Sequence, residues 1–140
     1  MTMSGRTKAR KRALDVLYAA DLRGLDPVAV LSERAELPDQ VPMGDYAERL
    51  VRGYVENAER IDDLISAHAE GWTLPRMPPV DRSILRIATY ELLYSGEVPP
   101  AVAVDEAVEL AKALSTDRSS GFVNGVLGQI LTVAPRSGSA

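Results

Sequence analysis

The stretch RTKARKRALDVLYAADL, from Arg6 to Leu22, decides the fold class. Apolar residues recur in it at the i, i+3, i+4 and i+7 spacing of one helical face; they are Ala9, Ala13, Val16, Leu17 and Ala20. The stretch also opens with a basic cluster, which consists of Arg6, Lys8, Arg10, Lys11 and Arg12. It therefore predicts an amphipathic helix over about 6–23 whose exposed first two turns carry five cations.

The basic cluster contrasts with the rest of the chain. The whole sequence has a formal charge of −4, and the residues after position 12 contain 11 basic side chains against 20 acidic ones. Segregated positive charge is typical of an arm that binds an anionic partner, although a solvated helix end has the same appearance. Cations at a helix N-terminus oppose the helix dipole, which favours a ligand that neutralises them.

The composition argues against catalysis and against a metal site. A chain of 140 residues suits one domain, and it has no cysteine for a disulfide or a thiolate site. His68, the single histidine, continues an apolar helical face and is interpreted as a packed residue. Asp62 and Asp63 point about 100° apart on a helix, so they do not form an acid/base pair. We expect no enzymatic activity, no metal and no cofactor.

Membrane insertion and export are also disfavoured. No apolar run reaches the length of a membrane span, and no apolar segment follows the basic N-terminus as in a signal peptide. We therefore expect a cytoplasmic protein.

Turn signals divide the remaining sequence into further helices. Asp26 and Pro27 predict a helix start, followed by a short helix to about Leu37 and a turn at 38–42. Apolar spacing then predicts one long or gently broken helix over 43–68. A proline-rich linker at 71–80 precedes three helices at about 81–94, 101–114 and 119–133. The result is an all-α chain with an N-terminal helical half over about 6–70, a C-terminal half over about 81–133 and a disordered tail at 134–140.

The last predicted helix contains unusual residues. Gly125 and Gly128 each cost roughly 1 kcal/mol relative to alanine in a helix. We expect close helix packing to offset this cost, with the approach of a ligand as the alternative. Asn124 is expected to make an internal hydrogen bond, with a ligand contact as the alternative. Ser119 and Ser120 are interpreted as helix caps rather than nucleophiles.

Tyr18 follows the basic cluster on the first predicted helix. It is either a stacking platform for nucleic-acid bases or a core residue. Together with the cations, it predicts a binding site for single-stranded nucleic acid more than for duplex DNA.

Three segments together resemble the NusB family of bacterial transcription antitermination factors. They are ILRIATYELLY at 84–94, VPPAVAVDEAVELAK at 98–112 and FVNGVLGQI at 122–130, and the basic opening followed by ALDVLYAADL is similar to that family's first helix. The similarity covers nearly the whole chain in order. It implies a single domain of two small helical bundles packed roughly perpendicular, with about six to seven helices in total.

The resemblance also implies a function. Family members bind the boxA RNA of ribosomal RNA leader transcripts together with the ribosomal protein NusE, and the complex acts on RNA polymerase with other Nus factors. The positions that match the family's RNA contacts are Arg6, Lys8, Arg10, Lys11, Arg12, Tyr18 and Phe122. Asp81 matches a NusE-facing position, with Arg82 and Glu91 as further candidates. An acidic body suits a basic ribosomal protein.

Two other functions stay open. The chain is alternatively a protein-only adaptor of the transcription machinery with a merely solvated basic arm. It is alternatively the NusB-like RNA-binding domain of a ribosomal RNA methyltransferase, if the chain is a fragment. Homodimerisation, which hides part of the RNA surface in some family members, also stays open. The sequence departs from the family at Gly128, where an acidic residue is frequent, and in the variable loop at 115–120.

Overall fold

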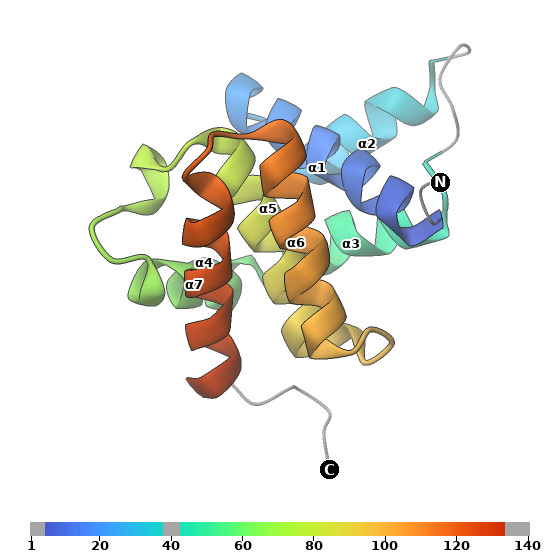
Figure 1. The fold of residues 1–140 in the computed structure, drawn as a ribbon. Helices are drawn as coiled ribbons and strands as arrows, with labels where there is room; N and C mark the ends of the chain where they lie inside the picture. Colours follow the sequence, from blue (N-terminus) through green and yellow to red (C-terminus); the bar gives the residue numbers. More distant parts are fainter. Residues whose placement is uncertain (1–4, 38–42, 134–140) are drawn as a thin grey trace.

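The computed structural model describes residues 5–37 and 43–133, which fold into seven α-helices, a 3₁₀ turn and a π-helical turn (Figure 1). These elements are α1 (Gly5–Arg23), α2 (Pro27–Ala35), α3 (Asp45–Glu56), α4 (Ala58–His68), η1 (Leu74–Arg76), α5 (Pro79–Tyr90), η2 (Glu91–Ser95), α6 (Pro100–Leu114) and α7 (Ser119–Val133). The predicted all-helical fold is confirmed over these residues. Within them, no helix combines the length and apolarity needed to cross a bilayer.

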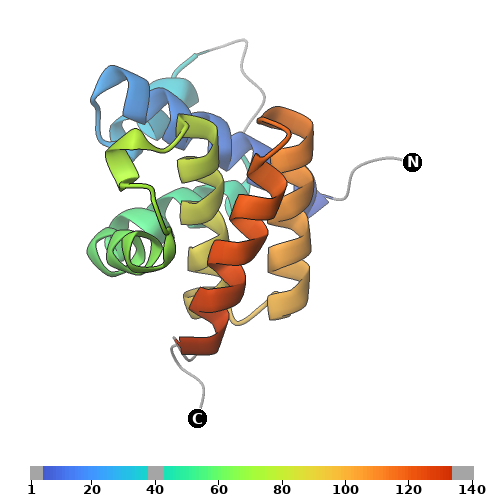
Figure 2. The same cartoon turned by 60° about the vertical axis from the view of Figure 1, so that its left-hand side comes forward.

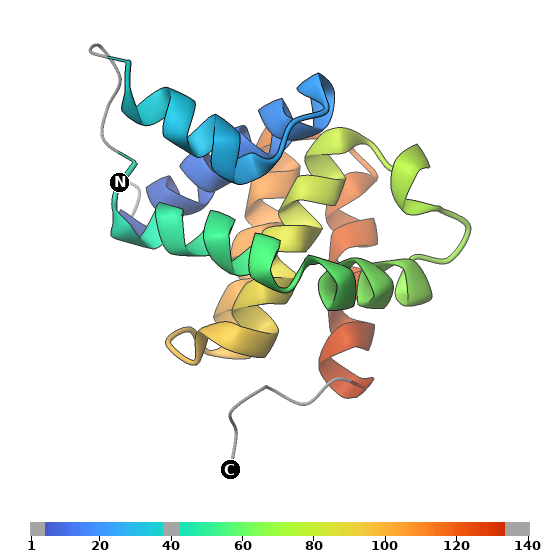
Figure 3. The ribbon, with the colours of Figure 1, turned by 180° about the vertical axis from the view of Figure 1, so that it is seen from behind.

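Helix α5 lies at the centre of the molecule. It packs against α1, α3, α4, α6 and α7, and its sequence explains this position because Ile84, Leu85, Ile87 and Ala88 are all buried. Helices α6 and α7 run side by side in opposite directions, with α1, α2 and α3 grouped together (Figures 1 and 2). Figure 3 shows this group from behind. The arrangement leaves one side of α1 at the surface.

The long helix predicted over 43–68 is broken into α3 and α4. The break falls at Asn57, whose backbone leaves the helical region with φ −121° and ψ 20°. Its side-chain amide donates a hydrogen bond of 2.8 Å to the carbonyl of Gly53. An asparagine amide that competes for backbone groups in this way favours a helix end.

The helix predicted over 81–94 also differs from expectation. Helix α5 begins earlier, at Pro79, because proline is well suited to the first turn of a helix. Its last turn is π-helical over Glu91–Ser95, and Gly96 ends the helix with a φ of 70°. Single π-helical turns inside α-helices frequently lie at functional sites. Here the turn contains the buried carboxylate of Glu91.

The start of α2 is confirmed, and the linker has its own structure. The Asp26 carboxylate accepts a 2.7 Å hydrogen bond from the backbone N–H of Val28, so it caps the helix as predicted. In the linker, η1 precedes Met77, which is buried in the core. The predicted turn at 38–42 and tail at 134–140 lie outside the described residues.

The expected packing role of the α7 glycines is wrong. A Cβ atom at Gly125 or Gly128 would meet no atom within 4 Å, so neither residue permits a close helix approach. Gly53 of α3 has that role instead, because a Cβ there would lie 2.2 Å from a ring carbon of Tyr90. Asn124 is exposed rather than internally hydrogen-bonded.

Candidate nucleic-acid interface

The outward side of α1 carries free positive charge. Lys8 and Lys11 are exposed and Arg12 is partly exposed, and none of the three pairs with a carboxylate in the described part of the chain. Lys8 lies three residues before Lys11 and four before Arg12, so these side chains are neighbours on the helix surface. Three cations that lack an internal partner can neutralise phosphates.

Tyr18 extends this surface along the helix. It follows Lys11 by seven residues, or almost two turns, and therefore lies on the same stripe. Its side chain is half-buried. The structure therefore does not make Tyr18 a fully buried core residue, and part of its side chain remains accessible.

The expectation that Arg10 is an exposed phosphate ligand is wrong. Its guanidinium is buried, and its Nε and Nη2 atoms each donate a 2.9 Å hydrogen bond to the Glu91 carboxylate. A third nitrogen lies 3.5 Å from Glu106 on α6. Arg10 thus fastens α1 to η2 and α6. The sequence signal for this pair was the lone charge of Glu91 within the apolar run IATYELLY.

Tyr46 of α3 lies next to this pair, within the segment for which the sequence analysis predicted only an apolar helical face. Its hydroxyl donates a hydrogen bond to Glu91. Burial raises the pKa of Tyr46 to about 12, and the hydrogen bond to Glu91 and the negative charge of Glu91 act in the same direction. The ring is flanked by the guanidinium groups of Arg6, Arg10 and Arg49, at 4.9, 5.9 and 5.2 Å from its centroid.

Arg6 faces the body of the molecule, away from Lys8. Its Nη2 atom lies 3.4 Å from a carboxylate oxygen of Glu97, and Arg49 donates a 2.8 Å hydrogen bond to the other oxygen. The hydrogen bond from Arg49 lowers the pKa of Glu97 below its usual value. All three side chains are substantially exposed.

Phe122 belongs to an aromatic pair that was not predicted from the sequence. It lies in the first turn of α7, half-buried, and its ring meets that of Trp72 in an edge-on pair with centroids 6.4 Å apart. Trp72 is 46% exposed. The structure brings Phe122 to an aromatic surface pair, whereas Tyr18 takes no part in a described ring pair.

Two of the three candidates for the protein interface are buried. Asp81 accepts hydrogen bonds of 2.5 Å from Ser115 and 2.8 Å from Ser119, which join the start of α5 to the segment between α6 and α7. Ser119 is the first residue of α7, and its hydroxyl donates to Asp81, which differs from the expected role as a helix cap. Glu91 is occupied by Arg10 and Tyr46. Both carboxylates are buried and bonded within the chain, so the expectation that Asp81 and Glu91 lie on an exposed protein-binding surface is wrong.

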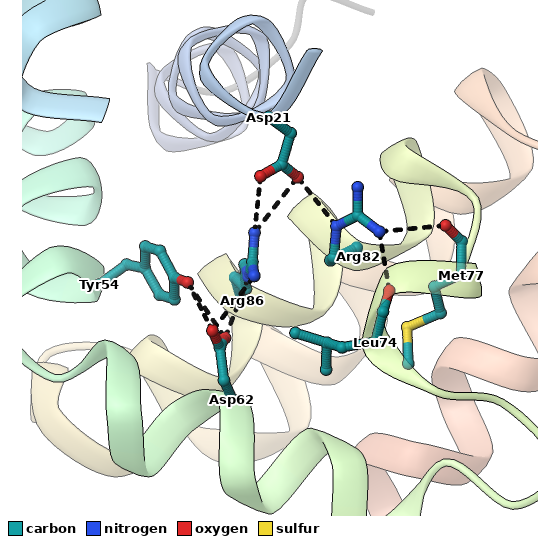
Figure 4. A network of polar contacts seen from close by, with 7 residues as sticks. All are labelled: Asp21, Tyr54, Asp62, Leu74, Met77, Arg82 and Arg86. Carbon is teal, nitrogen blue, oxygen red and sulfur yellow. Dashed lines mark hydrogen bonds and ion pairs between the residues drawn. The ribbon is translucent and has the colours of Figure 1, made fainter. Parts of the chain in front are cut away.

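Arg82, the third interface candidate, is also held internally. It donates to Asp21 at 2.9 Å and to the carbonyl oxygens of Leu74 and Met77 at 2.7 and 3.3 Å (Figure 4). These bonds connect the C-terminal end of α1, the start of α5 and the linker. Only a small part of the Arg82 side chain reaches the surface.

The same network continues through Arg86 (Figure 4). Arg86 bonds to Asp21 of α1 and makes a two-point ion pair with Asp62 of α4, at 3.0 and 3.1 Å. The Tyr54 hydroxyl also donates to Asp62. Burial raises the pKa of Tyr54. Both ends of α1 are therefore tied to the body by arginine–carboxylate pairs, which holds the free cations in a fixed position.

The remaining titratable candidates do not form a catalytic or metal-binding group. Asp62 is engaged with Arg86, whereas Asp63 is exposed. The Nδ1 atom of His68 lies 3.3 Å from the amide oxygen of Gln129. Within the described residues, no group of three His, Asp or Glu side chains is placed to hold a metal ion.

Comparison with known proteins identifies the family. The family model described as "NusB family" matches residues 7–132. This chain belongs to the NusB family. A curated relative from Saccharopolyspora erythraea, named transcription antitermination protein NusB, is 61% identical over 135 residues, which covers 96% of this chain and 91% of the relative. The chain is thus a NusB-type transcription antitermination protein and not an enzyme, in agreement with the expectation from sequence.

Solved structures of NusB proteins share the fold. T. maritima NusB superposes with a TM-score of 0.82 at 37% identity, over 95% of this chain and 94% of that one. A crystal structure of the antitermination factors NusB and NusE in complex with double-stranded RNA gives a TM-score of 0.77 at 31% identity, over 94% and 98% of the two chains. The helical arrangement described above is therefore that of the NusB family.

Proposed function

We propose that this NusB-family protein binds single-stranded boxA RNA of ribosomal RNA leader transcripts together with the ribosomal protein NusE. The complex then acts on RNA polymerase, with other Nus factors, in the cytoplasm. The observation that carries the proposal is the free positive charge of Lys8, Lys11 and Arg12 on a rigidly held helix of an otherwise acidic protein. The existence of a NusB–NusE complex with RNA among the structural relatives supports it.

The proposed RNA surface consists of phosphate-binding and base-stacking parts. Lys8, Lys11 and Arg12 neutralise phosphates, and the accessible parts of Tyr18 and Phe122 stack on bases, which is a combination common in proteins that bind single strands. Arg10 is left out because Glu91 occupies its guanidinium. Its role in this surface is to hold α1 in place.

The proposed NusE contact depends on charge complementarity. Ribosomal proteins are basic as a class, and exposed carboxylates on the body of this chain speed and orient the docking of such a partner. Because Asp81 and Glu91 are buried, other surface residues must supply the contacts.

The test is the fluorescence anisotropy of a labelled boxA RNA and a scrambled RNA, each with and without NusE. The double variant Lys8→Glu with Lys11→Glu should bind boxA at least about tenfold more weakly, since two phosphate contacts become repulsive. The double variant Arg52→Glu with Arg60→Glu makes the same change in net charge on α3 and α4 and should bind normally. Circular dichroism should show all proteins equally folded.

The salt dependence gives a second measure of the same site. Single-stranded binding loses about 0.7 in log K per log unit of salt for each neutralised phosphate, so the three free cations alone contribute about −2 to the slope. Equal binding of boxA and scrambled RNA under all conditions would contradict the proposal. Binding to NusE without any preference for RNA would instead favour the protein-only adaptor.

A further inference from the structure

We propose that Arg49 of α3 acts with Arg6 of α1 as a second phosphate site for the RNA backbone, and that the Glu97 carboxylate occupies this site in the free protein. The inference rests on the proposed RNA-binding function and adds a residue outside the N-terminal helix. It concerns a phosphodiester group of the bound strand.

The first argument is the convergence of two guanidinium groups on one carboxylate. Arg6 approaches Glu97 Oε2 at 3.4 Å, and Arg49 donates to Oε1 at 2.8 Å. These arginines come from helices that are far apart in the sequence, and Glu97 lies in the segment between η2 and α6. Two planar guanidinium groups around one anion form an arrangement that also suits a phosphate.

The second argument is that the two arginines are held in place independently of the Glu97 carboxylate. Both guanidinium groups lie over the Tyr46 ring, at 4.9 and 5.2 Å from its centroid. The ring itself is held by the hydrogen bond from the Tyr46 hydroxyl to Glu91, which is the buried partner of Arg10. Cation–π contacts therefore keep the guanidinium groups near the same position when the carboxylate leaves.

The third argument is that Glu97 is replaceable. The exposed fractions of the side chains are 41% for Glu97, 46% for Arg6 and 54% for Arg49. Ion pairs at this exposure contribute little to stability, so little is lost when they open. A phosphodiester has the same charge of −1 as the carboxylate, and Glu97 can turn into water as the phosphate enters. The exchange leaves the charge around Tyr46 unchanged.

The site also has a defined extent. Arg6 and Lys8 are two residues apart and so lie on nearly opposite sides of α1. Both are near its N-terminal end, so a strand that crosses this end of the helix passes both side chains. Beyond Arg49, a groove beside α3 is lined by residues of mixed charge that include Asp45, Glu48 and Glu56. These acids disfavour a phosphate there, so the proposed path ends at Arg49.

The experiment compares arginine variants of α3 in the boxA anisotropy assay. Arg49→Ala should weaken RNA binding about threefold to tenfold and make the salt slope shallower by about 0.7. Arg52→Ala is the matched control, since Arg52 is similarly exposed but pairs with Glu48 one turn away. It should leave both quantities unchanged.

The carboxylate is tested with Glu97→Gln. This variant should tighten RNA binding about threefold, because the competing anion is removed while the side chain keeps its size. Glu33→Gln is its control, because Glu33 is a similarly exposed carboxylate that pairs with Arg23 away from this site, and it should have no effect. In the Arg49→Ala background, Glu97→Gln should lose much of its benefit, since the two residues belong to one site.

The outcomes separate this inference from the proposed function. If the Lys8 and Lys11 variant loses RNA affinity while Arg49→Ala binds normally, the second site is overturned and the proposed function stands. If the wild-type protein shows no boxA preference, both are overturned. Weaker binding by Glu97→Gln would overturn the exchange, because Glu97 would then be positioning the arginines. A change in oligomeric state of Arg49→Ala in sedimentation, without a change in RNA affinity, would assign the cluster to self-association.

Discussion

Arg10 and Glu91 form a two-point ion pair with both N–O distances at 2.9 Å and with almost no exposure to solvent. The pair joins residues that are 81 positions apart, one in the basic cluster and one in a π-helical turn. Its geometry shows that a cation in the N-terminal cluster serves the fold. The basic cluster is therefore divided into the free cations Lys8, Lys11 and Arg12, an exposed ion pair at Arg6 and a buried anchor at Arg10.

The first prediction concerns this anchor. Glu91→Ala leaves the Arg10 guanidinium buried without its main partner, and removal of one member of a buried ion pair typically costs about 3–5 kcal/mol. We expect a loss of this size in the free energy of unfolding measured by urea denaturation. Glu109→Ala is the control, because its pair with Lys112 is exposed, and it should change stability by less than about 1 kcal/mol. Equal effects of the two variants would show that the Arg10 pair contributes no special stability.

The second prediction concerns the contact between α3 and α5. Gly53→Ala places a Cβ 2.2 Å from the Tyr90 ring, and overpacking of this kind costs about 1–3 kcal/mol. Thermal or urea unfolding should show the destabilisation. In a Tyr90→Ala background the ring is gone, so the same substitution should no longer destabilise the protein. An unaltered cost in that background would mean that the ring is not the cause.

The third prediction uses the glycines of α7. Gly125→Ala meets no atom within 4 Å, so it should stabilise the protein by about 0.5–1 kcal/mol through the higher helix propensity of alanine. Gly125 thus provides a matched control for Gly53. Destabilisation by Gly125→Ala would indicate a close neighbour that the structure does not show.

These glycines also show what the sequence could and could not predict. The apolar spacing in α1, the Asp26 cap and the α7 bounds depend on nearby residues, and all were predicted correctly. The packing role of Gly53 depends on Tyr90, which is 37 positions away, and no local pattern reports such a contact. The sequence instead drew attention to Gly125 and Gly128, which are exposed.

In the candidate site, too, features set by nearby residues were predicted correctly and features set by distant contacts were not. Lys8 and Lys11 were placed at the surface correctly, because helical spacing alone determines which side they occupy. Arg10 and Asp81 were misplaced, because their burial depends on Glu91 and on Ser115 and Ser119. A charged residue is rarely buried without a partner. Because the sequence does not reveal these partners, it predicted that both side chains are exposed.

The fourth prediction concerns Asp81. Asp81→Ala removes the acceptor for Ser115 and Ser119 and leaves a buried hydroxyl with fewer partners, which costs about 1–3 kcal/mol. The free energy of unfolding should fall by this amount. Asp117→Ala, at an exposed position of the same loop, should leave it nearly unchanged. If both variants are equally stable, the hydrogen bonds of Asp81 do not fasten this loop to α5.

The last prediction concerns stability in alkaline solution. The pKa of Tyr46 is about 12 in the folded protein against an ordinary value of 10.0, with burial as the largest cause. As the pH rises from about 10 to about 12, the unfolded chain loses this proton first, so the unfolded state becomes more favourable. Stability contributed by Tyr46 is therefore present below pH 10 and is lost as the pH rises through the folded pKa.

The measurement compares wild type with Tyr46→Phe by urea denaturation at several values between pH 9 and pH 12. The phenylalanine variant keeps the ring under the arginines and lacks the titrating hydroxyl. We expect it to be less stable than wild type at pH 9, because Glu91 loses a donor, and to lose less stability on going to high pH. Ultraviolet absorbance of phenolate should show one late-titrating tyrosine fewer in the variant. Parallel pH profiles for the two proteins would contradict the raised pKa of Tyr46 and its cause in the buried pair beside it.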